Sequence, residues 1–135
     1  MENEIDTCLV DCEVQSVDTV DLMNDTFTSK AIESMAKKEV PVLDEFSTKK
    51  YPLGKANTYV NARGYLAAKL ELISQNMAHI KKPRYAAAGF TVKAFQKRPE
   101  GKGVIFDECE LLCIGLCEKH ADPTIPSIGS DNGNR

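Results

Sequence analysis

The chain has 135 residues, of which 42% are hydrophobic and 27% charged, and its formal net charge is -3. This length and composition predict one globular domain whose core needs neither disulfides nor a metal ion. There is no run of about 18 apolar residues to span a membrane, and the acidic start lacks the pattern of a signal peptide. We therefore expect a cytoplasmic protein with no membrane partner, and its five cysteines to be reduced thiols.

Charges are segregated along the chain. Residues 1–43 hold ten acidic and three basic side chains, residues 44–103 hold four acidic and twelve basic ones, and residues 104–135 hold six acidic and two basic ones. A basic middle therefore lies between two acidic ends, and this segregation indicates which partners the chain can attract.

The first 25 residues form an acidic segment that we expect to be partly flexible. Alternating apolar residues between Cys8 and Val14 indicate a short strand within it. Thr28 or Ser29 can cap a helix that runs to about Glu39. The residues between this helix and Ala56 include Pro52 and Gly54 and are typical of a loop.

Residues 57–82 show a clear helical pattern. Apolar side chains recur at steps of three or four, at Tyr59, Ala62, Leu66, Leu70, Ile73, Met77 and Ile80. Such spacing predicts an amphipathic helix with one buried face. Asn57 is a suitable N-cap for this helix, and Pro83 is expected to end it. We expect this helix to be the central element of the fold.

Beyond Arg84 the apolar period shortens, and residues 91–106 predict a β-hairpin with its turn at the prolines and glycines near 99–103. Residues 108–119 are rich in cysteine and fit a helix, which we prefer, or a buried strand. Residues 122–135 predict a disordered polar tail. The predicted fold is thus a small α+β domain over residues 26–121, with the helix packed against the hairpin and the cysteine-rich element.

The side chains suited to metal binding or catalysis do not form a recognisable motif. Cys109, Cys113, Cys117 and His120 could in principle bind zinc, but one helix cannot arrange four ligands around an ion. His79 and His120 are the only histidines, and neither lies in a known nucleophile motif. We therefore predict a protein that is not an enzyme and has no metal or cofactor.

The basic middle is the strongest functional signal, because it also contains seven of the nine aromatic residues. Cations that neutralise phosphates and rings that stack on bases are the components of single-stranded nucleic-acid binding, to DNA or RNA. The predicted binding residues fall in three groups: Lys49, Lys50, Tyr51 and Lys55; Lys81, Lys82, Arg84 and Tyr85; and Lys93, Lys97, Arg98 and Lys102. If the hairpin packs beside the end of the helix, the last two groups merge into one patch.

The segregated charges also allow a second interpretation. The acidic ends could fold back onto the basic middle of the same chain or dock onto the basic middle of a neighbouring copy. An acidic protein partner could also bind to the basic middle. The alternative prediction is therefore a protein-interaction or self-assembly protein that forms a homo-oligomer.

Overall fold

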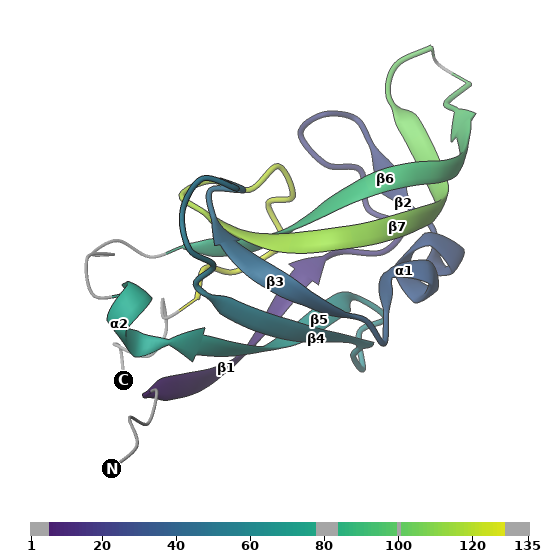
Figure 1. The fold of residues 1–135 in the computed structure, drawn as a ribbon. Coiled ribbons are helices and arrows are strands. Elements are labelled where there is room, and N and C mark those ends of the chain that lie inside the picture. The colour runs from purple at the N-terminus through teal and green to yellow at the C-terminus, as the bar shows by residue number, and fades with distance from the viewer. Residues whose placement is uncertain (1–5, 78–83, 100, 129–135) are drawn as a thin grey trace.

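The computed structural model describes residues 6–77, 84–99 and 101–128. Most of these residues lie in strands, which Figure 1 shows curled into an open half-barrel. The elements are β1 (Thr7–Gln15), β2 (Thr26–Phe27), α1 (Ser29–Met35), β3 (Glu39–Asp44), β4 (Gly54–Val60), β5 (Leu66–Ile73), α2 (Ser74–Met77), β6 (Tyr85–Lys97) and β7 (Val104–Cys117). Neither α1 nor α2 is long and apolar enough to cross a membrane, and the described residues contain no other helix.

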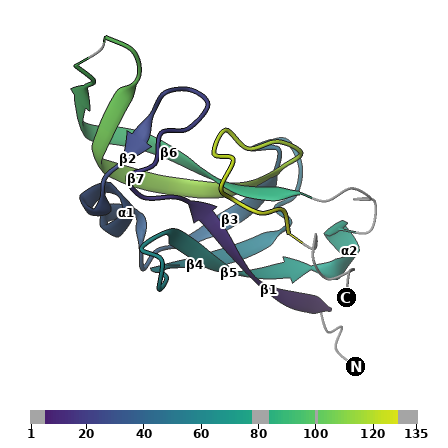
Figure 2. The same ribbon diagram turned by 180° about the vertical axis from the view of Figure 1, so that it is seen from behind.

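One mixed sheet contains all seven strands. Its order is β1-β5-β4-β3-β7-β2, and β6 pairs with the opposite edge of β7. The pairings of β7 with β2 and β3 are parallel, and the others are antiparallel. Figures 1 and 2 show how the sheet curls so that β1 and β6, at its two ends, approach each other.

The predicted α+β fold with a central helix over residues 57–82 is wrong. Residues 54–73 instead form the antiparallel β4–β5 hairpin, and Asn57, the expected N-cap, pairs with Lys69 across it. Leu66, Ala68, Leu70 and Leu72 are buried at every second position, which is the period of a strand with one buried face. The positions shared by the two periods, such as Leu66 and Leu70, misled the prediction. The rest of the expected helix, residues 78–82, lies outside the described residues.

Asn61 and Gly64 explain why the chain turns where the helix was expected. The Asn61 side-chain oxygen accepts hydrogen bonds from the backbone N–H groups of Arg63 and Tyr65, at 2.9 and 3.1 Å. Gly64 has a φ of +80°, a conformation that costs glycine little. Asparagine at the first position and glycine at the fourth favour a tight turn, so these two residues join β4 to β5.

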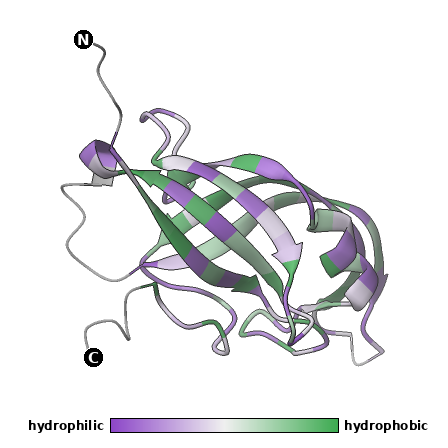
Figure 3. Ribbon diagram, turned by 90° about the horizontal axis from the view of Figure 1, so that it is seen from below, coloured by the Kyte–Doolittle hydropathy of each residue, from purple (hydrophilic) through white to green (hydrophobic). Residues whose placement is uncertain are grey.

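The helix expected after residue 28 is present, although it is shorter than predicted. Thr28 is the N-cap and its hydroxyl accepts a hydrogen bond from the backbone of Ala31 at 3.2 Å. The helix ends at Met35 rather than near Glu39, because Glu39 begins β3. Ala31, Ile32 and Met35 face the core. Figure 3 shows the matching alternation of hydrophobic and hydrophilic residues along the strands that make up the rest of the core wall.

The hairpin predicted over residues 91–106 is also present, but it is much longer. It extends over all of β6 and β7, from the pair Tyr85–Cys117 to the pair Lys97–Val104. The cysteine-rich residues therefore belong to a strand, and the preferred helix over residues 108–119 is wrong. Cys109, Leu111, Ile114 and Leu116 are buried in β7.

The chain remains packed beyond residue 121. His120 Nε2 lies 2.9 Å from the carbonyl oxygen of Val14, and the buried carboxylate of Asp122 accepts a 3.0 Å hydrogen bond from the Ser16 N–H. The N–H of Ile128 donates to the carbonyl oxygen of Arg84 at 2.7 Å. Residues 120–128 therefore connect the end of β1 to the start of β6 and lie across the face shown in Figure 2.

Candidate nucleic-acid interface

The β3–β4 loop, residues 45–53, contains three of the predicted binding residues and is firmly anchored. Its start is held by a 3.0 Å hydrogen bond from the Glu45 N–H to the carbonyl oxygen of Leu116 in β7. At its end, the Leu53 N–H donates to Val42 at 2.7 Å, and the Asn76 side chain donates to the carbonyl oxygen of Pro52 at 2.8 Å. The sheet and α2 thus hold this loop from both sides.

Phe46 fixes the loop on the outer surface of the β6–β7 hairpin. A β-carbon on Gly115 would lie 2.5 Å from Phe46 Cε1, and one on Gly89 would lie 3.1 Å from the same atom. The ring therefore occupies the space that these two glycines leave free. Glu45 and Phe46 have positive φ angles of 51° and 62°, which are unfavourable for residues with a β-carbon. The contact of the ring with the hairpin offsets this strain.

Asp44, at the end of β3, is the centre of an ion-pair network under the loop. Its carboxylate lies 3.1 Å from Lys50 Nζ and 3.1 Å from Arg84 Nη1. Arg84 also contacts Glu45 at 3.3 Å and the carbonyl oxygen of Leu116 at 3.2 Å. Burial alone would raise the pKa of Asp44, but its contacts with Lys50 and Arg84 outweigh burial and lower it. The network therefore holds Asp44 ionised.

Beside the loop is an open groove of about 670 Å³. It continues into a smaller hollow that shares Tyr51, Gln75 and Asn76 with it and also contacts Asp44 and Lys50. The groove is lined by Thr7, Tyr51, Pro52, Gly54, Lys55, Glu71, Ile73, Gln75 and Asn76. Its walls thus combine apolar surface, side-chain amides and one ion pair, and its volume is in the range typical of ligand sites.

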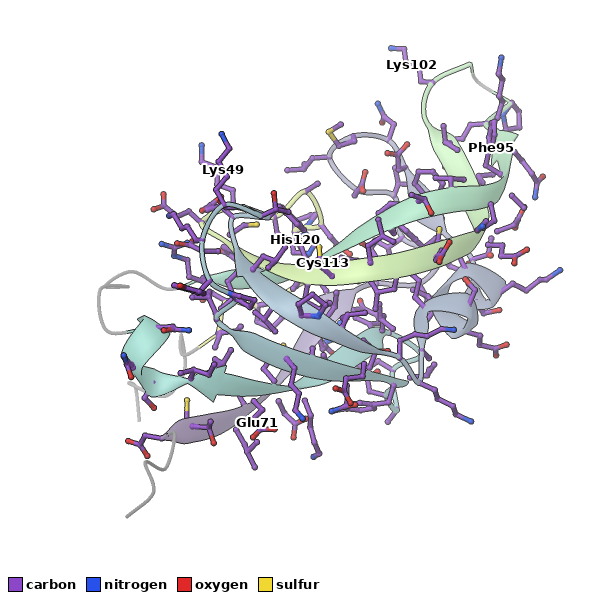
Figure 4. The ribbon with its side chains drawn as sticks, viewed as in Figure 1. Lys49, Glu71, Phe95, Lys102, Cys113 and His120 are labelled. Carbon is purple, nitrogen blue, oxygen red and sulfur yellow. The ribbon has the colours of Figure 1, made fainter. Side chains whose placement is uncertain are left out.

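Three residues of the first predicted group lie at this groove or at the adjoining hollow. Tyr51 forms part of the rim with 87% of its surface exposed, while Lys50 and Lys55 line the smaller hollow and the groove, respectively. Each of these two lysines lies beside a carboxylate, Lys50 beside Asp44 and Lys55 beside Glu71. Lys49 is exposed on the same loop but outside both linings, and Figure 4 labels it.

The two described residues of the second predicted group, Arg84 and Tyr85, do not form a free surface. Lys81 and Lys82 lie outside the described residues. The guanidinium of Arg84 is committed to the network around Asp44. Tyr85 packs edge-on against His120, with 6.3 Å between the ring centroids.

The third predicted group lies on the far part of the β6–β7 hairpin. Lys93 pairs with Glu110 at 3.3 Å, and Arg98 donates to the hydroxyl of Thr26 at 3.0 Å. Lys97 and Lys102 are exposed near the hairpin turn, and Figure 4 shows Lys102 far from Glu71, which lines the groove. Because β6 is 13 residues long, about 40 Å in an extended strand, Arg84 and Lys97 do not share one patch.

Acidic residues of the N-terminal segment pair with the basic middle inside the chain. Asp11 lies 3.4 Å from Lys69, and Glu13 lies 3.0 Å from Arg63. The Tyr59 hydroxyl also donates to Asp11 at 3.0 Å. Folding back is therefore one use of the segregated charges, while docking onto a neighbouring copy remains a prediction.

Three of the cysteines are poorly suited to nucleophilic chemistry. Burial, together with neighbouring carboxylates, raises the pKa of Cys12 to about 12 and the pKa values of Cys109 and Cys117 to about 11. A thiol is a nucleophile only as the thiolate. Within the described residues, no group of three or more histidine, cysteine, aspartate or glutamate side chains is arranged to hold a metal ion.

Comparison with known protein families, curated proteins and solved structures found no significant match. The site is therefore defined by its geometry alone. Sequence reasoning missed Gln75 and Asn76, which line the groove, since they were assigned to the outer face of the expected helix. It also missed the anchoring role of Phe46, because nothing in the residues around it indicates a left-handed backbone.

Proposed function

We propose that the protein is a non-enzymatic module that binds single-stranded nucleic acid at the groove beside the β3–β4 loop. The observation that carries this proposal is the position of Tyr51, whose almost fully exposed ring stands at the rim of the groove of about 670 Å³ that Lys55 also lines. The exposed face of this ring is available to stack on a base, and stacking of this kind is tolerant of base identity.

Lys50 and Lys55 can leave their present ion pairs for a phosphate at a small free-energy cost. Lys55 lies 4.0 Å from Glu39 and 3.9 Å from Glu71, and exposed pairs of this kind contribute only about 0–1 kcal/mol. Lys50 can also exchange partners, because Asp44 keeps its contact with Arg84. A phosphate backbone passing the loop would therefore replace weak contacts by stronger charge-assisted ones.

The groove offers a base both apolar contact and hydrogen bonds. Pro52 and Ile73 supply apolar surface, and Gln75 supplies an amide that can donate and accept. The loop that carries Tyr51 is anchored at both ends, so binding does not require ordering it. Such preorganisation reduces the entropic cost of binding.

The test is a titration of labelled single-stranded and duplex oligonucleotides of one sequence, followed by fluorescence anisotropy at several salt concentrations. We expect tighter binding of the single strand, with an affinity that falls as salt rises. Tyr51→Ala should weaken binding roughly 5- to 150-fold, the equivalent of about 1–3 kcal/mol for one stacked base. The matched control is Phe95→Ala, which removes an exposed ring on the hairpin.

Two results would contradict the proposal. One is the absence of binding at low salt for the unmodified chain. The other is an equal loss of affinity in the Tyr51 and Phe95 variants, which would show that binding does not depend on the groove.

A further inference from the structure

The first half of β1 is an edge of the sheet that no described strand covers. Residues 7–11 pair with residues 69–73 of β5 on one side only. Residues 120–128 cover β1 at its other end, through the contacts of His120 with Val14 and of Asp122 with Ser16. Leu9, in the middle of the uncovered half, is 75% exposed. An uncovered edge with apolar side chains is a template for another strand.

The uncovered half of β1 also lacks the features that normally protect an edge. Proteins block edge pairing with lysine, proline, bulges or short strands. Residues 7–11 contain no lysine, proline or glycine, and their register with β5 is regular up to Glu13. The other end of the sheet differs, since β6 carries Lys93 and Lys97 and has three register irregularities. β6 is therefore protected and β1 is not.

We propose that this edge of β1 pairs with the same edge of a second copy, in an antiparallel and two-fold symmetric dimer. The inference goes beyond nucleic-acid binding and does not depend on it. An antiparallel pairing centred on Leu9 places Leu9 opposite Leu9 of the second copy, Cys8 opposite Val10, and Thr7 opposite Asp11. Each apolar residue then meets an apolar residue, and no two like charges are opposed, which favours cross-strand pairing.

The charges near the proposed interface and its symmetry are both compatible with this register. Asp11 is already balanced by Lys69 at 3.4 Å within its own chain, so it brings no unpaired charge to the interface. The pairing is isologous, because one surface meets itself, and it closes after two copies. It joins the two sheets into one, with the order β5-β1-β1-β5 at the centre.

Cysteine cross-linking tests the register directly. In a Cys8→Ser background, which removes the exposed native thiol, Leu9→Cys places two thiols opposite each other across the symmetry axis. The Cα atoms of directly opposite residues are about 4.5–5.5 Å apart, within the range of about 4.4–6.8 Å that a disulfide bridges. We expect mild oxidation to convert this variant to a covalent dimer. The control is Leu22→Cys in the same background, because Leu22 is 74% exposed but lies outside β1.

The full chain should also show a mass that rises from monomer to dimer with concentration in sedimentation or light scattering. Leu9→Lys places two like charges opposite each other and should raise the dissociation constant at least about tenfold, with an unchanged circular dichroism spectrum as the check on folding. A monomeric mass at all concentrations would overturn the proposal. Equal cross-linking of the Leu9 and Leu22 variants would overturn it as well.

Discussion

The β3–β4 loop and the β6–β7 hairpin are both rich in lysine and aromatic residues, but the structure places these residues in different surroundings. In the loop, Tyr51 borders a groove of about 670 Å³, and Lys50 lines the smaller hollow beside it. In the hairpin, Lys93 pairs with Glu110 across two strands, and Phe90 packs against Phe27 and Phe106. Cations and rings form a candidate binding site only where the backbone also provides a concave surface.

Removal of Arg84 should affect stability most. Arg84→Met removes one of the two cations that contact the buried carboxylate of Asp44, and loss of a partner in a buried ion pair costs up to about 3–5 kcal/mol. The matched variant in the hairpin, Lys93→Met, breaks an exposed pair that contributes about 0–1 kcal/mol. Urea denaturation of both variants measures the difference, and similar losses would show that the network does not anchor the loop.

A methyl group under Phe46 should displace the loop. Gly115→Ala brings a β-carbon to 2.5 Å from the ring, and overpacking of this kind costs about 1–3 kcal/mol. We also expect weaker oligonucleotide binding, since the loop carries Tyr51. In the hairpin turn, Gly101→Ala meets no atom within 4 Å and bears only the strain of its φ of +83°. It should reduce stability without changing affinity.

The two regions should respond to pH with opposite signs. Burial would raise the pKa of Asp44, but contact with Lys50 and Arg84 outweighs burial and lowers this pKa below 3.8. At the hairpin, Asp25 accepts a hydrogen bond from Val104, and burial raises the pKa of Asp25. A lowered pKa means that the stabilisation present above pH 3.8 is lost as the pH falls through the folded-state pKa. A raised pKa means that the stabilisation present below pH 3.8 is lost as the pH rises through the folded-state pKa.

Substitution by asparagine separates these two contributions. Asp44→Asn should reduce the loss of stability on acidification, and Asp25→Asn should reduce the loss on raising the pH above about 4. Denaturant midpoints measured between pH 2.5 and 6 give both slopes. Slopes of the same sign would show that the assigned causes are wrong.

The smallest expected effect is on the salt dependence of binding. Lys55→Met removes one lysine that lines the groove and should reduce the slope of log affinity against log salt by about 0.7 for a single strand. Lys102→Met removes an exposed lysine at the far end of the molecule and should leave the slope unchanged. An equal change in both variants would indicate binding over the whole surface.

Short-range signals in the sequence predicted local elements well. Thr28 was correctly identified as a possible cap because its hydroxyl bonds within the first turn of the helix, and the β6–β7 hairpin followed from its turn residues. The central helix failed since Leu66 and Leu70 fit both the helical and the strand period. Asn61 and Gly64 were the discriminating signal, because asparagine and glycine at this spacing favour a turn.

The candidate site was only partly predictable. Lys49, Lys50, Tyr51 and Lys55 are close in sequence, so any compact loop would bring them together. Gln75 and Asn76 join them through the antiparallel pairing of β4 with β5, which places Leu72 opposite Gly54, and the predicted helix excluded that pairing. Arg84 looked like a surface cation, and only the parallel pairing of β3 with β7 places Asp44 beside it.

The position of β7 in the chain has a consequence for how the protein folds. β7 is the last strand, yet it pairs with β2 and β3 from the first third of the chain as well as with β6. At a synthesis rate of about 5–20 residues per second, β2 and β3 are synthesised several seconds before β7. Pairings over such sequence separations are also slow to form, typically in milliseconds to seconds. The nascent chain therefore cannot complete this core until β7 has been synthesised.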